Sequence, residues 1–188
     1  MIDISMHIMD LVQNSIRANA QAVTLVFDEK SVEDRLYIYL KDDGDGMDEV
    51  SLKRAQEPFY TSRTTRRVGL GIPMIKMTSE QSNGWCKIKS DKGKGTELEI
   101  VFCTNNVDCL PLGDLPAYLS LILSANPELQ FSFKYMLDEH RFEFSTDELK
   151  QAGIDDFSNS GMRQSIKEFL KENLNDLFRF RKKNSHLC

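Results

Sequence analysis

The segment that decides the fold is residues 35–46, RLYIYLKDDGDG, in which an alternating apolar stretch runs directly into an acidic, glycine-rich loop. Leu36, Ile38 and Leu40 alternate with other residues, as in a strand with one buried face. Residues 42–46 (DDGDG) then hold two glycines, which let the backbone turn steeply and approach a flat ligand closely. A carboxylate at the end of the strand can accept a hydrogen bond from an exocyclic amine.

Taken alone, this acidic loop is also compatible with an ordinary turn or with part of a calcium site. A calcium loop needs further oxygen ligands and a bidentate Glu at a set spacing. Asp45 and Asp48 fit that template poorly. The sequence on both sides of the loop is needed to discriminate between these alternatives.

Hydrophobic spacing on both sides of the loop predicts helices and strands in alternation. Ile8, Leu11 and Val12 follow helical spacing, and Ser5 can cap that helix at its start. The predicted helices are 5–18, 48–55, 70–82, 114–124, a short one after Thr146 and 160–178, and the predicted strands are 22–28, 35–41, 85–90, 96–103, 129–136 and 140–145.

The order of these elements predicts an α+β fold. Antiparallel hairpins separated by helices imply a two-layer α/β sandwich, with helices covering one face of the sheet. The stretch 104–113 has the composition of a connector. We therefore expect a first domain over residues 1–104 and a small C-terminal α+β unit over residues 105–188. Trp85 is expected in the core.

Composition argues against several classes of protein. The 188 residues carry a net charge of −5 with a pI near 5.3, so wholesale nucleic-acid binding is not expected. The chain has no apolar run of membrane-spanning length and no secretory signal at its start, so a cytoplasmic location without membrane contact is expected. The four cysteines form no Cys-x-x-Cys pair and are expected to be free thiols.

Three further patterns carry chemistry only in combination. Asp10 and Asn14 share one helix face, where a carboxylate and an amide can hold a magnesium ion and orient a water. Residues 69–71 (GLG) precede a predicted helix, whose free N–H groups suit a phosphate. Residues 93–96 (GKGT) enter the last strand of the first domain. Singly, these patterns are compatible with a solvated helix face or a plain turn.

Together the patterns form an ordered series. They are DxxxN at 10–14, DxGxG at 42–46, EPFYT at 57–61, GxG at 69–71 and GxGT at 93–96. This series resembles the N, G1, F, G2 and G3 boxes of the gyrase, heat-shock chaperone, histidine kinase and mismatch-repair (GHKL) superfamily of ATP-binding proteins. The resemblance covers about residues 5–103. The loop EPFYTS is most similar to the short lid of bacterial histidine kinases, and DLVQNSIRANA to the first helix of the mismatch-repair and anti-sigma-kinase branches.

The resemblance implies the Bergerat, histidine kinase-like fold, with ATP and Mg²⁺ as ligands. Asn14 would coordinate Mg²⁺, and Asp42 would read the adenine amino group with help from Thr96 through water. The lid arginines Arg63, Arg66 and Arg67 are either phosphate contacts or a solvated basic loop. The nucleotide-contacting positions that the resemblance implies are Asn14, Arg17, Asp42, Gly44, Gly46, Met47, Phe59, Thr61, Arg63, Gly69, Leu70, Gly71 and Thr96.

Two positions depart from the family pattern. The hydrolysing branches place Glu where this chain has Asp10, which is the implied catalytic residue. The shorter Asp can still act through a modest shift or a second water, or it can leave a site that binds ATP and turns over very slowly. The first lid glycine is replaced by Arg67 or Val68, so a stiffer lid is expected.

We expect a Mg²⁺-dependent ATP-binding protein with slow hydrolysis that acts as a nucleotide-driven switch on a protein partner. One alternative is a protein kinase for a separate partner, of histidine kinase or anti-sigma serine kinase type. Another is a non-catalytic ATP sensor. Because the chain starts a few residues before the first box, a self-contained histidine kinase is not expected. The oligomeric state stays open.

Overall fold

The computed structural model describes residues 3–57, 71–154, 157, 160–181 and 187. None of the helices in these stretches is long and apolar enough to cross a membrane. The helices are α1 (Ile4–Arg17), α2 (Glu49–Ala55), α3 (Gly71–Gln81), α4 (Leu115–Ala125), α5 (Thr146–Gln151) and α6 (Ser160–Phe178), and the strands are β1 (Ala22–Lys30), β2 (Arg35–Asp42), β3 (Trp85–Asp91), β4 (Gly95–Cys103), β5 (Gln130–Leu137) and β6 (His140–Ser145).

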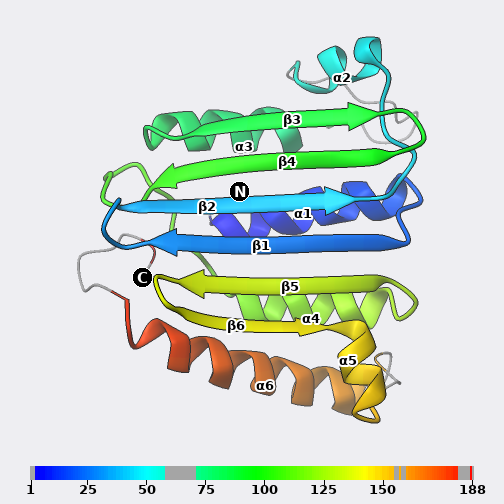
Figure 1. The fold of residues 1–188 in the computed structure, drawn as a ribbon, viewed down its shortest axis with the longest axis vertical. Helices are drawn as coiled ribbons and strands as arrows, with labels where there is room; N and C mark the ends of the chain where they lie inside the picture. Colours follow the sequence, from blue (N-terminus) through cyan, green and yellow to red (C-terminus); the bar gives the residue numbers. More distant parts are fainter. Residues whose placement is uncertain (1–2, 58–70, 155–156, 158–159, 182–186, 188) are drawn as a thin grey trace.

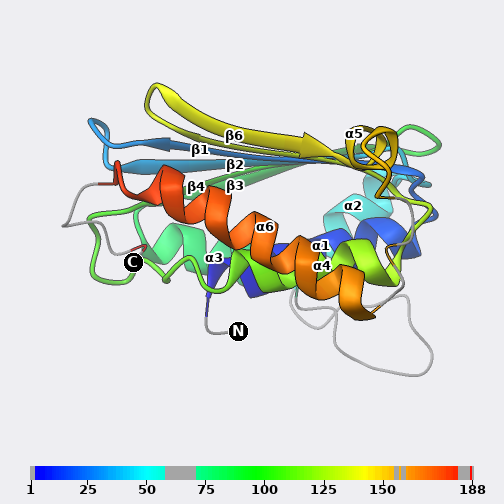
Figure 2. The ribbon, with the colours of Figure 1, turned by 90° about the horizontal axis from the view of Figure 1, so that it is seen from below.

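One six-stranded sheet forms the first layer, in the order β3-β4-β2-β1-β5-β6 (Figure 1). Neighbouring strands are antiparallel except β1 and β5, which run parallel. Helices α1, α3, α4 and α6 lie together beneath one face of the sheet, and the described helices leave the opposite face open (Figure 2). The predicted two-layer α+β sandwich is therefore confirmed.

The core lies between these two layers, as the alternation in the central strands predicts. Leu25 and Phe27 of β1 are buried, and they lie opposite Leu40 and Ile38 of β2 in the register of the hairpin. Residues paired across a sheet share a face, so these side chains all point toward the helices. Full burial of such a side chain is worth roughly 1.5–3 kcal/mol.

The start of α1 differs from the prediction. The N-cap is Asp3, whose side chain accepts from the Met6 amide, and Ser5 lies inside the helix. The hydroxyl of Ser5 donates to the carbonyl of Leu112 instead. A serine can cap a helix only from the position before its first turn, and here an aspartate already occupies that position.

The C-terminal stretch adds to the same sheet. Strand β5 pairs with β1 along its whole length, from Ala22 opposite Gln130 to Glu29 opposite Leu137. The connector reaches back to α1 as well, because the carbonyls of Pro111 and Leu112 accept from the first amides of that helix at 2.9 Å. Strands and connector thus join residues on either side of position 104, and the division into units 1–104 and 105–188 stays a prediction.

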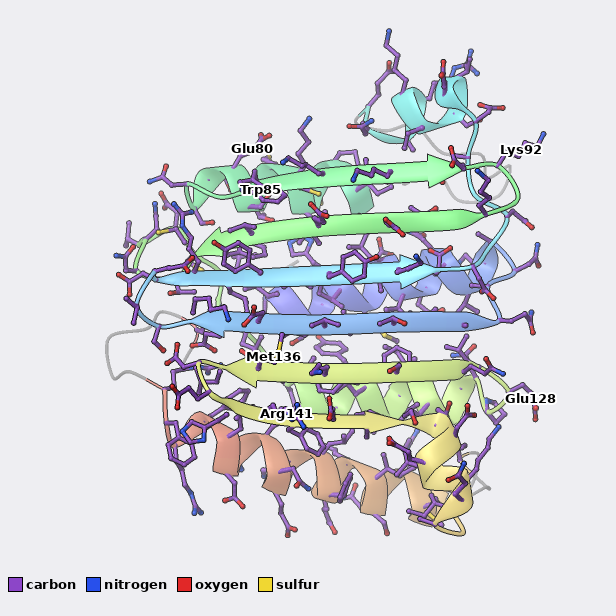
Figure 3. All side chains as sticks on the ribbon, in the orientation of Figure 1. Glu80, Trp85, Lys92, Glu128, Met136 and Arg141 are labelled. Carbon is purple, nitrogen blue, oxygen red and sulfur yellow. The ribbon has the colours of Figure 1, made fainter. Side chains whose placement is uncertain are left out.

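Trp85 lies at the start of the edge strand β3 and is 36% exposed, so its expected place in the core is wrong (Figure 3). In the strand register it shares the open face with Val101 and Tyr37. The ammonium of Lys87 lies 4.3 Å from the centroid of its ring. The described helices form no second layer over this face that could bury the indole of Trp85.

Candidate functional site

A pocket of about 660 Å³ opens at the end of the sheet where β2 ends and the β3–β4 hairpin turns. Lys92 marks this turn in Figure 3. The walls are the C-terminal half of α1, the loop after β2, helix α2 and the start of α3. The predicted site residues that line it are Asp10, Asn14, Arg17, Asp42, Gly46, Met47, Gly71 and Thr96.

The other predicted positions lie elsewhere or cannot be placed. Gly44 belongs to the acidic loop but lies against Ala18 of the α1–β1 turn. The predicted lid residues Phe59, Thr61, Arg63, Gly69 and Leu70, together with Arg66, Arg67 and Val68, lie outside the described residues.

Asp42 is a buried carboxylate, 5% exposed, at the end of β2. Its Oδ1 accepts from the backbone amides of Gly44 at 3.0 Å and Thr96 at 3.2 Å. Its Oδ2 accepts from the hydroxyl of Ser15 at 2.6 Å. Three donors from the loop, from β4 and from α1 therefore fix the orientation of this carboxylate at the pocket wall.

The other two aspartates of the loop hold the chain in place. Oδ1 of Asp43 accepts from the amides of Gln21 and Ala22, both at 2.8 Å, where β1 begins. Oδ2 of Asp45 accepts from the side-chain amide of Asn19 at 2.8 Å. Asp43 and Asp45 thus tie the loop to the turn after α1, while Asp42 and Asp45 both line the pocket.

The glycines of the loop and hairpin allow two protein segments to approach each other. Gly46 has a φ of +61°, and a Cβ there would collide with the carbonyl oxygen of Asp91. Gly95 has a φ of +97°, and a Cβ there would collide with the carbonyl oxygen of Asp42. These glycines therefore allow the acidic loop and the β3–β4 hairpin to pack closely together. The sequence predicts instead that the loop glycines let the backbone approach a flat ligand.

A chain of hydroxyl groups fastens the same hairpin to the loop. The amide of Met47 donates to Ser90 Oγ at 2.8 Å, and Ser90 Oγ lies 2.9 Å from Thr96 Oγ1. The amide of Gly93 donates to the carbonyl of Asp45 at 2.7 Å. Thr96, which lies opposite Asp42 in the strand register, thus has a hydroxyl with a defined neighbour at the pocket wall.

At the other end of the pocket, Asp10 and Asn14 meet the N-terminus of α3. A Cβ on Gly71 would collide with Asp10 Oδ2 and lie 3.2 Å from Asn14 Nδ2. The missing side chain therefore brings free N–H groups of a helix end next to a carboxylate and an amide. Arg17 Nη1 donates to Asn14 Oδ1 at 3.0 Å, so a cationic group already touches the oxygen that the sequence assigns to Mg²⁺.

His7, one turn before Asp10 and Leu11, does not line the pocket. It is 1% exposed, and neither ring nitrogen has a hydrogen-bond partner among the described residues. Burial lowers the pKa of this imidazole from 6.5 to about 4. His7 is therefore a neutral, packed side chain, as its helical position suggests.

Several residues that line the pocket have no motif in the sequence that marks them, and Ser15 and Lys92 are two polar examples. Ser15 follows Asn14 directly in the sequence, but a single serine on a helix has no spacing that reveals a partner 27 residues away. Lys92 lies in a turn whose composition indicates only a hairpin. Neither residue could be singled out without the fold.

Comparison with known proteins agrees with this geometry. The sequence profile of the family described as histidine kinase-, DNA gyrase B-, and HSP90-like ATPase matches residues 2–106. The chain belongs to this ATPase family. Family membership and the arrangement of the pocket together support ATP binding, which is the shared property of the family.

The individual relatives are larger proteins. The chain is 43% identical over 68 residues to sporulation kinase E of Bacillus subtilis (strain 168), a match that covers 36% of this chain and 9% of that kinase. It is 28% identical over 92 residues to sporulation kinase C of the same organism, covering 49% of this chain and 21% of that kinase. The matched segments thus make up less than half of this chain and a small part of each kinase.

A solved structure, the N-terminal domain of a DNA repair protein, resembles the fold with a TM-score of 0.56 at 16% sequence identity. The match covers 86% of this chain and 59% of that one. At this identity the likeness concerns the fold alone. It extends beyond the length of the family profile.

Proposed function

We propose that the chain binds ATP with Mg²⁺ in this pocket, hydrolyses it slowly, and acts as a nucleotide-driven switch on a protein partner. The observation that carries the proposal is Asp42, a buried carboxylate held by three donors at one end of the pocket. The other end offers Asn14, Asp10 and the N-terminus of α3, the groups that suit phosphates and a hard cation. A base-reading end and a phosphate-reading end thus share one cavity.

The residues have distinct roles in this proposal. Asp42 accepts from the amino group of adenine, and Thr96 supports the same edge. The carboxamide oxygen of Asn14 would hold Mg²⁺, which neutralises phosphate charge when bound, and Arg17 would turn from that oxygen toward a phosphate. Asp10 orients a water near the terminal phosphate. Positioning and charge neutralisation are the main needs of phosphoryl chemistry.

A second candidate is phosphoryl transfer to a separate protein. The similarity to sporulation kinases E and C favours it. A non-catalytic sensor would use the same binding residues without depending on Asp10. These readings share the nucleotide site and differ in what happens at the terminal phosphate.

Calorimetric titration of ATP with Mg²⁺ tests the site. Asp42→Asn should weaken binding roughly 10- to 100-fold, because a charged acceptor for the amino group is lost. The fold should survive, since the remaining amide oxygen still accepts from Gly44 and Thr96. Asp91→Asn is the control, because the Asp91 side chain is 71% exposed in the neighbouring hairpin. Equal ATP affinity for wild type and Asp42→Asn would refute the proposed site.

A further inference from the structure

Strand β6 has one side of its backbone open to a further strand. In the described sheet, β6 is an edge strand that pairs with β5 alone. Antiparallel pairing uses the backbone groups on one side of a strand, so the other amides and carbonyls of β6 face outward. Within the described part of the chain, no backbone bond from another segment reaches residues 141–144. The described lining of the nucleotide pocket includes no residue of β5, β6 or α6, so this edge is a separate surface.

Exposed aromatic rings lie along the same edge. Helix α6 runs beside β6 on the helix-covered side and reaches past it (Figures 1 and 2). Phe169 of α6 packs edge-on against Phe142 of β6, with ring centroids 5.9 Å apart, and remains 43% exposed. Phe180, just after α6, stacks on His140 with centroids 3.6 Å apart and is 57% exposed. Among the described phenylalanines, only these two are exposed. Side chains on the helix side of an added strand would meet these rings.

The open face of this edge carries more positive than negative charge. Arg141 and Glu143 alternate with Phe142 along β6, so they lie on the opposite face of the sheet. Lys134 Nζ lies 2.9 Å from Glu143 Oε2, and Arg141 Nε lies 3.7 Å from Glu143 Oε1. One carboxylate thus faces two cations, and the Arg141 side chain is 66% exposed. An acidic residue on the added strand would balance this charge.

We propose that the β6 edge binds an extended segment of a partner protein by strand addition. The segment places an acidic residue opposite Arg141 and, next to it, an apolar residue opposite Phe142 that covers Phe169. Main-chain hydrogen bonds to β6 supply affinity, and the alternating side chains supply specificity. A second copy of the chain does not fit, because α6 reaches past β6 and the α6 of a copy paired through the same edge would occupy the same space (Figure 1). A single extended segment has no such helix.

The test selects a phage-displayed library of random octapeptides on the immobilised full chain. Enriched peptides should alternate apolar with polar residues and carry an acidic residue on the polar side. Fluorescence anisotropy then gives the dissociation constant of a selected peptide. Methylation of one alternate set of its backbone nitrogens should weaken binding at least about tenfold, because the donors to β6 are lost, and methylation of the other set should not. A library without binders, or enriched peptides without this pattern, would overturn the proposal.

Two variants of the chain locate the peptide on this edge. Arg141→Glu should weaken binding at least about tenfold, and replacement of the acidic residue of the peptide by lysine should restore it. Lys87→Glu makes the same charge reversal on the opposite edge strand, β3, and should leave binding unchanged. Phe169→Ala should weaken binding about fivefold or more. Its control is Leu121→Ala, since Leu121 on α4 has the same exposed fraction of 43%.

The remaining outcomes decide between occupants and between sites. A selected peptide that binds Arg141→Glu and Phe169→Ala as tightly as wild type would lie elsewhere, which would overturn the proposal. A dimer in sedimentation experiments that Arg141→Glu abolishes would make a second copy the occupant and would overturn it as well. Without nucleotide, Asp42→Asn protein should bind the peptide like wild type, so failure of the nucleotide site and failure of this edge are distinguished.

Discussion

Asp10 lies on the pocket side of α1, and its Oδ2 borders the position where a Gly71 side chain would be. A base in this place would activate water beside the terminal phosphate, and loss of such a group typically lowers rate by about 10²–10⁴-fold. We expect Asp10→Asn to lower phosphate release at least tenfold, with ATP affinity changed less than about twofold.

The measurement is steady-state phosphate release by pure wild-type and variant protein. An Asn variant that turns over at the wild-type rate would remove Asp10 as the base. The kinase and sensor readings would then stand ahead of hydrolysis.

His7 is a single residue whose protonation makes the stability of the protein depend on pH. Its pKa of about 4 in the folded protein is below the ordinary 6.5, so the unfolded chain binds more protons between these values. Stability is unaffected by this group above pH 6.5 and falls as the pH drops toward 4. At pH 5 the loss should be about 2 kcal/mol.

His7→Leu, which fills a similar volume with no titratable group, should remove that part of the acid sensitivity. Urea unfolding of both proteins at pH 7.5 and pH 5 gives the comparison. The free energy of unfolding of the variant, relative to that of wild type, should be higher at pH 5 than at pH 7.5. An identical pH dependence for the two proteins would contradict the role of His7.

Among the elements, the contact between α1 and α3 shapes the phosphate end of the pocket. Alanine is a better helix former than glycine by roughly 1 kcal/mol, and the backbone at Gly71 is not in the left-handed region. Gly71→Ala should nonetheless weaken ATP binding roughly tenfold, because its Cβ displaces Asp10 or the start of α3, and small displacements in a site are costly.

Gln81→Ala, an exposed change at the other end of α3, serves as the control for this variant. Calorimetry with Mg²⁺·ATP gives the affinities, and thermal melting should show the Gly71→Ala protein at least as stable as wild type. Unchanged affinity would mean that α3 does not need to approach α1 this closely.

Across the whole molecule, a buried ion pair joins the end of the chain to the central sheet. Arg181, just after α6, donates to both oxygens of Glu29 at 2.8–3.1 Å across 152 residues of sequence. Both side chains are at most 6% exposed. Tyr135 donates to Glu29 at 2.8 Å, and burial raises the pKa of its hydroxyl well above the ordinary range.

Removal of Arg181 leaves the buried Glu29 carboxylate without its counter-charge, with the Tyr135 hydroxyl still donating to it. Arg181→Ala should therefore destabilise the protein by about 3–5 kcal/mol. Arg179→Ala removes an exposed arginine that contacts Asp176 nearby, and should change stability by less than about 0.5 kcal/mol. Urea unfolding measures both. Equal stability of the two variants would show that the pair is dispensable.

Much of this architecture is already present in the sequence. The alternation in residues 22–28 and 35–41 predicted β1 and β2, and the predicted helix 160–178 coincides with α6. The ordered motifs identified the family and named fewer than half of the described residues that line the pocket. These features depend on neighbours within a few residues of one another, so periodicity and motif spacing are enough to reveal them.

Other features arise only from the tertiary structure. The parallel pairing of β5 with β1, the bond from Ser15 to Asp42 and the pair of Glu29 with Arg181 each join residues far apart in sequence. The local sequence around a single serine, arginine or glutamate does not distinguish a side chain on the solvated surface from one in a buried polar network. Only the folded chain decides which polar groups lose water together, and buried polar groups must then satisfy one another.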